Sequence, residues 1–452
     1  MIGGKKLRKK CFSDVSSHCS HASKSDGSEM PILKEQNSNC AASEKVKYGE
    51  LVVLGYNGFL PEVDRWCRRR RSKFVLYKRD SASGIKPSRH RAVPSSLASK
   101  AIMGTKRFSI SYSSPKDQAT VVEYVPDDNT DMFQIGRSAN SAIDCVVLDV
   151  FPGNLNVGKE SVKSTVSRFA CRLIADRTSP HIVRIYAAGF DSSRNIFVGE
   201  EATTWQNENT EIDGLTTNGV LIWHPQGTFL GGEIKPGWWR EVSIGGKIYS
   251  LRPSRCAREK GKMIKDESNI LQDGTLIDIC GATLLWRSDE GLKKSPTKSD
   301  LEELVDELNS GKPVCPVGLN TLVIPRKVTP DMNEDVSEKQ QPYVYLNCGH
   351  VQGSHNWGER TNSERCCPVC WTMGPVVKLC MGMEPAFYVD SGPLTFAFNP
   401  CGHMASEKTV KYWVNMTIPH GTNDFKVLCP FCVTPLAGST GYVRLIYQDH
   451  VD

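Results

Sequence analysis

The sequence predicts a mainly β protein, in which an antiparallel β-sandwich is followed by a small, zinc-stabilised α+β domain. Between residues 47 and 287, short runs of Val, Ile, Tyr and Phe are broken at near-regular intervals by Gly, Pro, Asn and Asp, which is typical of a β-sandwich. No stretch of that region holds a 3.6-residue apolar period for long. Beyond residue 342, a Cys-Gly-His signature followed by a Cys-x-x-Cys pair occurs twice.

The first 46 residues are expected to be a disordered tail. Residues 1–46 are rich in Ser, Lys and Asn, so they cannot bury enough surface to offset their ordering entropy. The net charge of +6 is low for 452 residues, and much of it lies in two basic runs, at 5–10 and 65–71. Each run is interpreted as a solvated segment, with a nuclear address as an alternative. This charge requires no nucleic-acid partner.

The sandwich is expected to span residues 47–289, from "KYGELVVLGYNG" to "DGTLIDICGATLLWR". Runs such as "RFACRLI" and "HIVRIYAAGF" supply its strands. Two segments fit no strand pattern: 62–110 is basic and Ser-rich, and 200–214 reads "EEATTWQNENTEIDG". We predict that both are inserted at one edge of the sandwich, as a wing.

Residues 290–341 are predicted to hold a helix and a linker. The helix is expected at about 299–310, with Ser299 and Glu302 as a capping box and Gly311 after its end. Its apolar stripe consists of Leu301, Leu304, Val305 and Leu308. The helix is therefore expected to be a connector with one buried face.

The lack of an apolar span indicates an intracellular protein. No segment approaches the ~18 apolar residues of a membrane helix, and the basic N-terminus is not followed by an apolar core. We therefore expect no membrane partner and a cytoplasmic location, with nuclear entry as an alternative. Because a reducing compartment opens disulfides, metal binding explains the seventeen cysteines better.

The cysteine-rich end, residues 342–452, is predicted to bind two structural zinc ions. Thiolate and imidazole ligands satisfy tetrahedral zinc when two close pairs converge. The pairs are Cys348/His350, Cys367/Cys370, Cys401/His403 and Cys429/Cys432. One Cys3His site per copy is favoured, and a cross-braced arrangement of the four pairs stays open. Four residues have no matched partner and are interpreted as structural: Cys366, Cys380, His355 and His420.

The stretch from Cys315 to Cys370, with "CPVG", "LNCGHVQG" and "CPVC", resembles a RING finger with gaps. Gly318 and Gly353 stand where a full RING finger has further cysteines. The resemblance implies binding of a ubiquitin-conjugating enzyme loaded with ubiquitin. Catalysis would then come from orientation of the thioester, without a covalent nucleophile on this chain.

By the same resemblance, three residues would contact the conjugating enzyme: Val317, Trp357 and Pro368. Packing over the zinc is the alternative role for Trp357. Active RING fingers often have a basic residue after the last cysteine, whereas Trp371 and Val433 occupy those positions here. By this resemblance, the basic side chain that usually bridges the conjugating enzyme and ubiquitin is absent from these two positions.

Three fragments of the predicted sandwich carry residues suited to gripping a phosphate: "FQIGRS", "TVSRFACRLI" and "DGLTTNGV". An arginine fork, a hydroxyl and an amide on loops at one end of a sheet can hold a phosphate and the peptide backbone beside it. In this order the fragments resemble a forkhead-associated (FHA) domain, which recognises phosphothreonine. Turn and capping roles are the alternative.

The FHA resemblance assigns a role to each candidate residue. Arg137 and Ser167 would bind the phosphate, helped by Arg168 and Thr217, and Asn218 would hold the peptide main chain. Ala170 stands where the family usually has a His, and that His is mainly structural.

Both regions together resemble the Pellino family of ubiquitin ligases over about residues 47–450, including "NTDMFQIGRS", "RIYAAGFDSSRNIF" and "YLNCGHVQGSHNWG". The resemblance implies a RING-type E3 ligase in innate immune signalling, downstream of Toll and interleukin-1 receptors. Its partners would be phosphorylated interleukin-1-receptor-associated kinases, to which it attaches polyubiquitin.

Two other functions remain open from the residues alone. The first alternative is a non-catalytic scaffold that binds phosphopeptides through the sandwich. Zinc-mediated nucleic-acid binding is weaker, because the intervals between the zinc pairs lack an interleaved basic and aromatic stripe. We also expect that removal of zinc unfolds residues 342–452 and leaves the sandwich intact.

Overall fold

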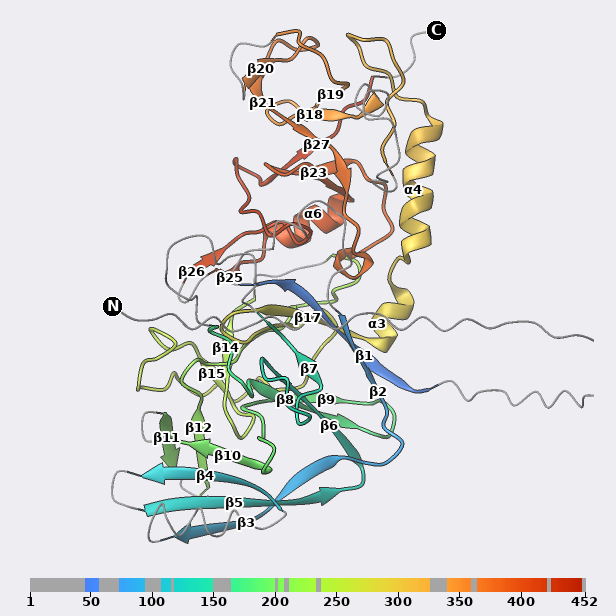
Figure 1. The fold of residues 1–452 in the computed structure, drawn as a ribbon. Coiled ribbons are helices and arrows are strands. Elements are labelled where there is room, and N and C mark those ends of the chain that lie inside the picture. Colours follow the sequence, from blue (N-terminus) through green and yellow to red (C-terminus); the bar gives the residue numbers. More distant parts are fainter. Residues whose placement is uncertain are drawn as a thin grey trace, which may run out of the picture. The chain divides into compact units, whose positions relative to one another are not determined.

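The computed structural model describes residues 45–56, 73–93, 107–114, 118–148, 164–199, 202–206, 211–232, 237–325, 340–358, 364–420 and 424–448 (Figure 1). Residues 45–452 form one compact unit. The predicted tail, apart from its last two residues, and both basic runs lie outside the described residues.

A seven-stranded antiparallel sheet forms one layer of the sandwich. Its strands are β1 (Lys47–Gly55), β2 (Lys73–Tyr77), β13 (Leu221–Trp223), β14 (Arg240–Val242), β15 (Ile248–Ser250), β16 (Leu276–Asp278) and β17 (Thr283–Ser288). They follow the order β15-β14-β13-β16-β17-β1-β2. The β1–β17 pair therefore joins the first and last strands of the predicted sandwich.

A four-stranded sheet forms the second layer. It consists of β6 (Thr130–Gly136), β7 (Cys145–Val146), β8 (Cys171–Asp176) and β9 (Val183–Ala187), in the order β7-β6-β8-β9. One apolar core joins both layers: it includes Ile135, Leu173 and Ile185 from this sheet and Leu51, Ile222 and Leu284 from the other. Two sheets that share an apolar core are a β-sandwich, so the predicted fold class is confirmed.

The wing combines two strands that the sequence pattern indicated, in the runs "TVVEYV" and "NIFVGE", with others that it did not. Its sheet has the order β10-β4-β5-β3, made of β3 (Gly84–Val93), β4 (Phe108–Ser114), β5 (Gln118–Asp127) and β10 (Asn195–Val198). A hairpin of β11 (Thr203–Gln206) and β12 (Ile212–Leu215) lies almost entirely within the second segment.

The segments 62–110 and 200–214, which fit no strand pattern in the sequence, nevertheless contain strands. β2 and β3 lie inside the first segment, and β11 and nearly all of β12 lie inside the second. The physical reason is visible in β3, which pairs with β5 along its length while residues 86–92 stay exposed. A solvated edge strand needs no apolar alternation, and its partner strand determines its conformation.

Within the described residues, the C-terminal region contains small sheets and a short helix. The first sheet contains β18 (Tyr343–Tyr345), β19 (Val351–Gln352), β20 (Glu364–Cys366) and β21 (Met373–Lys378). The second contains β22 (Cys380–Met381), β23 (Phe396–Phe398), β24 (His403–Ala405) and β27 (Tyr442–Arg444). The 3-10 turn η2 (Pro385–Phe387), helix α6 (Glu407–Val414) and a hairpin of β25 (Ile418–His420) and β26 (Asp424–Lys426) complete it.

Two helices join the sandwich to this region: α3 (Asp289–Lys294) and α4 (Lys298–Ser310). The buried face of α4 is as predicted, because Leu301 and Val305 are fully buried. Its cap differs: Thr297 and Asp300 form the capping box in place of Ser299 and Glu302. Both pairs have the required spacing of three residues, so the sequence motif alone could not choose between them. No helix within the described residues is long and apolar enough to cross a bilayer.

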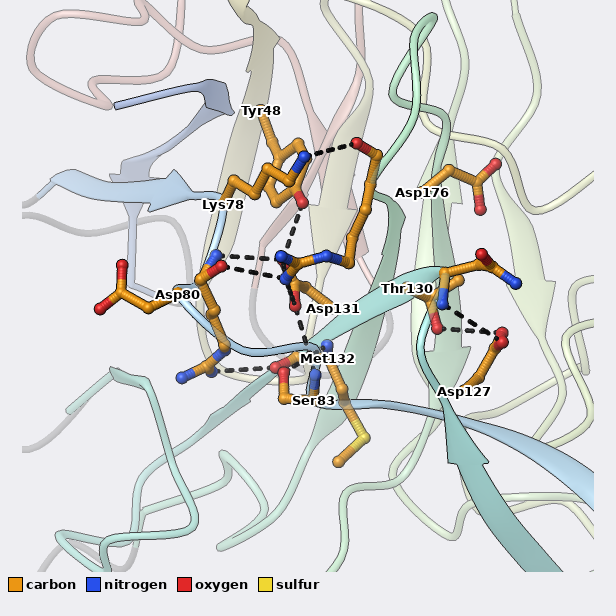
Figure 2. A network of polar contacts seen from close by, with 12 residues as sticks. Tyr48, Lys78, Asp80, Ser83, Asp127, Thr130, Asp131, Met132 and Asp176 are labelled. Atoms are coloured by element: carbon orange, nitrogen blue, oxygen red, sulfur yellow. Dashed lines mark hydrogen bonds and ion pairs between the residues drawn. The ribbon is translucent and has the colours of Figure 1, made fainter. Parts of the chain in front are cut away.

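A buried polar network fastens the segment after β2 to the second layer of the sandwich (Figure 2). The Asp131 side chain is fully buried and accepts a hydrogen bond from the Tyr48 hydroxyl at 2.7 Å. Arg177 donates to both of its oxygens, at 2.8 and 3.0 Å. The backbone N–H groups of Arg79 and Ser83 complete its partners, at 3.1 and 3.3 Å. One carboxylate thus joins three parts of the chain.

The Asp131→Ala variant is expected to lose about 3 kcal/mol of stability, because it leaves the Arg177 guanidinium, whose side chain is only 16% exposed, without its counterion. The measurement is the urea midpoint of tryptophan fluorescence in the full chain. Asp128→Ala, which removes an exposed carboxylate nearby in sequence, is the control and should leave the midpoint unchanged. Equal midpoints for the two variants would contradict the assigned role.

Candidate metal centres and phosphate-binding loops

Each Cys-Gly-His signature converges with the Cys-x-x-Cys pair of its own copy. The ligand atoms of Cys348, His350, Cys367 and Cys370 lie within 4.8 Å of one another, and so do those of Cys401, His403, Cys429 and Cys432. The eight predicted ligands therefore form two clusters of three cysteines and one histidine. Of the two arrangements that the sequence left open, the structure has one site per copy.

The two Cys-x-x-Cys pairs lie on turns with the same backbone pattern. In the first, Trp371 N–H donates to Cys367 O at 2.8 Å, and Cys367 N–H donates to Thr372 O at 2.9 Å. In the second, Val433 and Cys429 make the equivalent bond at 2.8 Å. Trp371 and Val433 both have a positive φ, 62° and 60°, which bulky residues rarely adopt. The side chains that stand in place of the expected basic residue differ in exposure: Trp371 is exposed to solvent, whereas Val433 is buried in the apolar core.

The glycine of each Cys-Gly-His signature is needed because another strand lies against it. Gly349 has φ 83°, and an added Cβ would lie 2.0 Å from Arg444 O. Gly402 has φ 74°, and its Cβ would lie 2.3 Å from Lys378 O. Arg444 ends the last strand of the second copy, and Lys378 ends β21 of the first. Each copy therefore packs a strand against the metal loop of the other, although each cluster uses ligands from one copy.

The "CPVG" segment folds as a third turn of this kind. Leu319 N–H donates to Cys315 O at 2.9 Å, Cys315 N–H donates to Asn320 O at 3.0 Å, and Leu319 has φ 51°. An added Cβ at Gly318 would lie 2.3 Å from Asn320 Oδ1. This turn keeps the backbone of a metal-binding turn, but Cys315 belongs to neither cluster.

The donor set of the clusters fits a tetrahedral thiophilic cation. Tetrahedral ligands at about 2.3 Å from a metal lie about 3.8 Å apart, within the spread observed here. Burial raises the pKa of the Cys348 thiol to about 12. Desolvation would also raise the pKa of Cys370, but hydrogen bonds with Thr372 and the other cluster cysteines lower it to about 6. The first cluster therefore already favours one thiolate.

A second layer of side chains orients the first cluster. The buried Gln352 donates its Nε2 to Cys367 Sγ at 3.5 Å, and its Oε1 lies 2.6 Å from His355 Nε2. His355, which has no matched partner in sequence, thus supports a ligand through Gln352. Sequence reasoning missed Gln352, because a glutamine two residues after the Cys-Gly-His signature carries no motif.

Four of the five predicted phosphopeptide residues line one cavity of about 350 Å³: Ser167, Arg168, Thr217 and Asn218. The amide of Asn218 bridges the two loops, donating to Thr165 O at 2.8 Å and to Ser167 Oγ at 3.4 Å. The lining also includes Phe197 of β10 in the wing and Asp191, which precedes that strand. The cavity therefore lies between the predicted phosphate loops and the wing.

Arg137, the fifth predicted residue, lies outside the lining of this cavity but is tied to its edge. Arg137 Nε donates to Val166 O at 2.8 Å, and its backbone N–H donates to Ser167 O at 3.1 Å. The preceding Gly136 allows this approach, because an added Cβ would lie 2.1 Å from Arg168 O. The side chain of Arg137 is exposed, so its remaining N–H groups face solvent next to the Ser167 loop.

Two arginines from the segment after β15 hold the Asn218 loop from behind. Arg252 donates to Thr216 O at 2.9 Å and forms an almost fully buried ion pair with Glu241. Arg255 donates to Asn218 O at 3.3 Å and is paired with Asp278. Sequence reasoning missed both residues, because a basic loop carries no sign of the buried carboxylates that it meets.

Ala170, at the position where FHA domains usually have a histidine, is held by backbone hydrogen bonds. Ala170 is buried, its N–H donates to Ile135 O at 2.8 Å, and its carbonyl accepts from Ala188 N–H at 2.9 Å. The Ser167 loop is therefore anchored at its C-terminal end without an imidazole.

Exposed apolar side chains lie on the Cys-x-x-Cys turn of the first copy and on the "CPVG" turn. Leu319 is 79% exposed and Trp371 is 71% exposed. Trp357, predicted as a contact residue, packs edge-on against Trp371 with ring centroids 5.6 Å apart. The other two predicted contacts, Val317 and Pro368, are half-buried. Leu319 was missed, because its exposure depends on the left-handed turn.

Comparison with known proteins assigns both regions. The family model "Pellino, FHA domain" matches residues 39–304, and "Pellino, RING domain" matches residues 308–452. This chain belongs to the Pellino family. The protein pellino of Drosophila melanogaster is 61% identical over 430 residues, which cover 95% of this chain and 99% of that relative.

Two human relatives are also similar to this Pellino chain. E3 ubiquitin-protein ligase pellino homolog 2 is 52% identical, with 92% of this chain and 99% of the relative covered. E3 ubiquitin-protein ligase pellino homolog 3 is 47% identical, with 90% and 92% covered. The sandwich with its wing is thus the FHA domain of a Pellino protein, and the two clusters lie in its RING domain.

Proposed function

We propose that this Pellino chain is a RING-type E3 ubiquitin ligase that binds phosphothreonine-containing clients through its FHA domain. The observation that carries the proposal is the presence, in one chain, of two Cys3His clusters and a cavity lined by the phosphate-loop residues. Relatives that match over nine-tenths of the chain are named E3 ubiquitin-protein ligases. The RING domain engages ubiquitin and a ubiquitin-conjugating enzyme, and the FHA domain engages the client.

Both clusters hold zinc in this proposal. Three thiolates and an imidazole are a preferred zinc donor set, and four protein ligands leave no open position, so the ion is structural. When bound, zinc supplies folding energy to the loops around it. The protein residues then do the work of catalysis: they hold the conjugating enzyme so that its ubiquitin thioester is oriented for attack by a client lysine.

The Gln352→Ala variant tests the second layer of the first cluster. Loss of its bond to Cys367 is expected to weaken zinc binding at this cluster by about 10–100-fold. A chelator titration of the full chain should therefore remove one ion early and the other at the wild-type concentration. The second cluster is the internal control, and simultaneous loss of both ions would contradict the assignment.

The exposed apolar side chains described above are proposed as the platform for the conjugating enzyme. Trp371 adopts a strained left-handed conformation and is largely exposed, a combination that costs stability and persists where it serves a function. With Leu319 and Trp357 it offers an apolar surface, flanked by Val317 and Pro368. The platform carries no covalent nucleophile.

Phosphothreonine recognition is assigned to the cavity and its edge. Arg137, bonded to Val166 O, and Arg168, next to Ser167 in the sequence, are both exposed and can form charge-assisted bonds to a phosphate. Ser167 and Thr217 supply hydroxyl groups. The Asn218 amide, already oriented by Thr165, is suited to the peptide main chain.

Family membership is the support for the finer assignments. We propose phosphorylated interleukin-1-receptor-associated-type kinases as clients, and Toll and interleukin-1 receptor signalling in innate immunity as the context. A cytoplasmic location follows from these partners and from the reducing conditions that thiolate-bound zinc requires. Fractionation of cells that express the tagged chain tests the location.

The function is tested by reconstitution. The full chain is combined with activating enzyme, a broad panel of conjugating enzymes and ubiquitin, and chain formation is expected with at least one of them. Phosphopeptide binding without chain formation across the panel would favour the second candidate, a non-catalytic scaffold. The observation that favours this candidate is the presence of Trp371 and Val433 where active RING fingers often have a basic residue.

A further inference from the structure

The outer face of the seven-stranded sheet is covered by the RING domain. A second apolar core, distinct from the core of the sandwich, draws members from both domains. Its FHA members are Val52, Leu54, Leu221, Trp223, Phe229, Trp239, Leu276 and Leu285. Its RING members include Phe387, Tyr388, Val389, Val410, Tyr412 and Trp413.

The strands that carry this core are apolar on both faces. In β1, Leu51 and Val53 lie in the sandwich core, whereas Val52 and Leu54 lie in the second core. β13, β16 and β17 alternate in the same way. A sheet with apolar residues on both faces has to be covered on both faces. The occupant of the outer face is therefore another part of this same chain.

Buried polar contacts fix the two domains relative to one another. Arg287 of β17 is fully buried and donates to Ala386 O of η2 at 2.7 Å. The Trp239 indole N–H donates to Thr417 O at 2.8 Å, and Gly231 N–H donates to Val389 O at 2.9 Å. These three bonds connect three FHA positions to two RING segments, around residues 386–389 and at Thr417, so they restrain rotation as well as separation.

Ionic and aromatic contacts add to these bonds. Lys73 of β2 forms an ion pair with the buried Glu384 at 2.6 Å. Phe229 packs edge-on against Tyr412 of α6, with ring centroids 5.0 Å apart, and the Arg287 guanidinium lies over the Phe229 ring. Two domains that share an apolar core with directional bonds at its edges move as one body and do not move independently about a flexible linker.

We propose that the FHA and RING domains form one rigid body through this interface, and that the rigid body restricts ubiquitin transfer to client lysines at a limited spacing from the phosphothreonine. The second half rests on the proposed function. The physical reason is that a tethered client lysine has a high effective concentration only where the fixed span between the two sites matches the peptide length.

The rigid body is tested in the full chain by single-molecule energy transfer. Dyes are attached through unnatural amino acids at Arg91 of β3 and Lys426 of β26, so that cysteine ligands stay unmodified. One narrow distribution is expected for the wild type. Trp239→Ala is expected to broaden it, whereas Trp238→Ala is the matched control, because Trp238 is 69% exposed and Trp239 is 7% exposed. Glu384→Lys, which places a cation opposite Lys73, is the second variant and should also broaden the distribution.

Lysine selection is tested with phosphothreonine peptides that carry a single lysine at increasing spacing. The wild type and Trp238→Ala are expected to modify a narrow window of spacings at least ~10-fold faster than the rest. Trp239→Ala should flatten this preference while zinc content and peptide affinity stay unchanged. A broad energy-transfer distribution in the wild type would overturn the rigid body, and so would a narrow distribution in both Trp239→Ala and Glu384→Lys. A flat lysine profile with a narrow distribution would overturn the lysine selection, and failure of every phosphopeptide to bind would instead overturn the proposed function.

Discussion

Cys367→Ala is expected to abolish ubiquitin chain formation. The substitution removes one of four ligands from the first cluster, and the remaining three do not satisfy a structural zinc ion. Because structural zinc contributes on the order of 10 kcal/mol to the folding of its domain, the loops that carry Trp357 and Trp371 should lose their arrangement. We expect zinc content to fall from two ions per chain to one, and activity to fall by at least ~100-fold.

The neighbouring cysteine is a matched control for this experiment. Cys366 lies outside both clusters, and its thiol contacts Trp371 O at 3.4 Å. Cys366→Ala should therefore keep two zinc ions and most of the activity. Zinc released by a thiol-reactive mercurial and chain formation with the best conjugating enzyme are measured in parallel. Full activity of Cys367→Ala with one ion would show that the first cluster does not shape the platform.

The shared core changes what zinc removal is expected to do. From the sequence, the sandwich should be unaffected when residues 342–452 lose their metal. In the structure, η2, α6 and the segment around Val389 cover apolar residues of β1, β13 and β17. Unfolding of the RING domain would expose these residues to water, which costs about 25 cal/mol for each Å² of apolar surface. Loss of zinc should therefore lower the stability of the sandwich as well.

The metal ligands could be predicted from sequence because the chemistry of each pair is local. A Cys-x-x-Cys turn and a Cys-Gly-His turn each bring two ligands together by backbone geometry, and all eight ligands fall into the two clusters. The sequence favoured the observed arrangement of one site per copy but left a cross-braced arrangement open, because the choice also depends on packing between the copies. Gly349 against Arg444 and Gly402 against Lys378 are contacts between segments far apart in sequence.

The strands of the sandwich could also be predicted from the sequence. The segment that covers the outer face of its seven-stranded sheet could not. Regular apolar runs identify strands, and the run "ELVVLG" in β1 was correctly assigned. The continuous apolar character of that run also carries the information that both faces are covered, because a half-exposed strand alternates apolar and polar residues. The segment that covers the outer face could not be identified, because Trp239 and Arg287 bond to residues 178 and 99 positions away in the sequence.

Arg137→Ala is expected to weaken binding of a phosphothreonine peptide by about 10–100-fold, the usual effect of losing a charge-assisted hydrogen bond. The side chain of Arg137 is exposed and donates a hydrogen bond from Nε to Val166 O at 2.8 Å. This bond holds the guanidinium beside the Ser167 loop and leaves its terminal N–H groups available for a phosphate. Arg137→Lys keeps the charge but loses this orientation, and it should bind with intermediate affinity. Arg89→Ala, which removes an exposed arginine from β3, is the control and should bind as the wild type does.

Isothermal titration with phosphorylated and unphosphorylated forms of one peptide separates the phosphate contribution from the rest. The wild type should prefer the phosphorylated form, and Arg137→Ala should lose that preference while ubiquitin chains still form in the absence of a client. Because Arg137 stands at the edge of the cavity and Arg168 lines it, the comparison also locates the phosphate. If Arg168→Ala removes binding and Arg137→Ala does not, the phosphate lies within the cavity toward the wing, and the role inferred for Arg137 from the FHA resemblance is wrong.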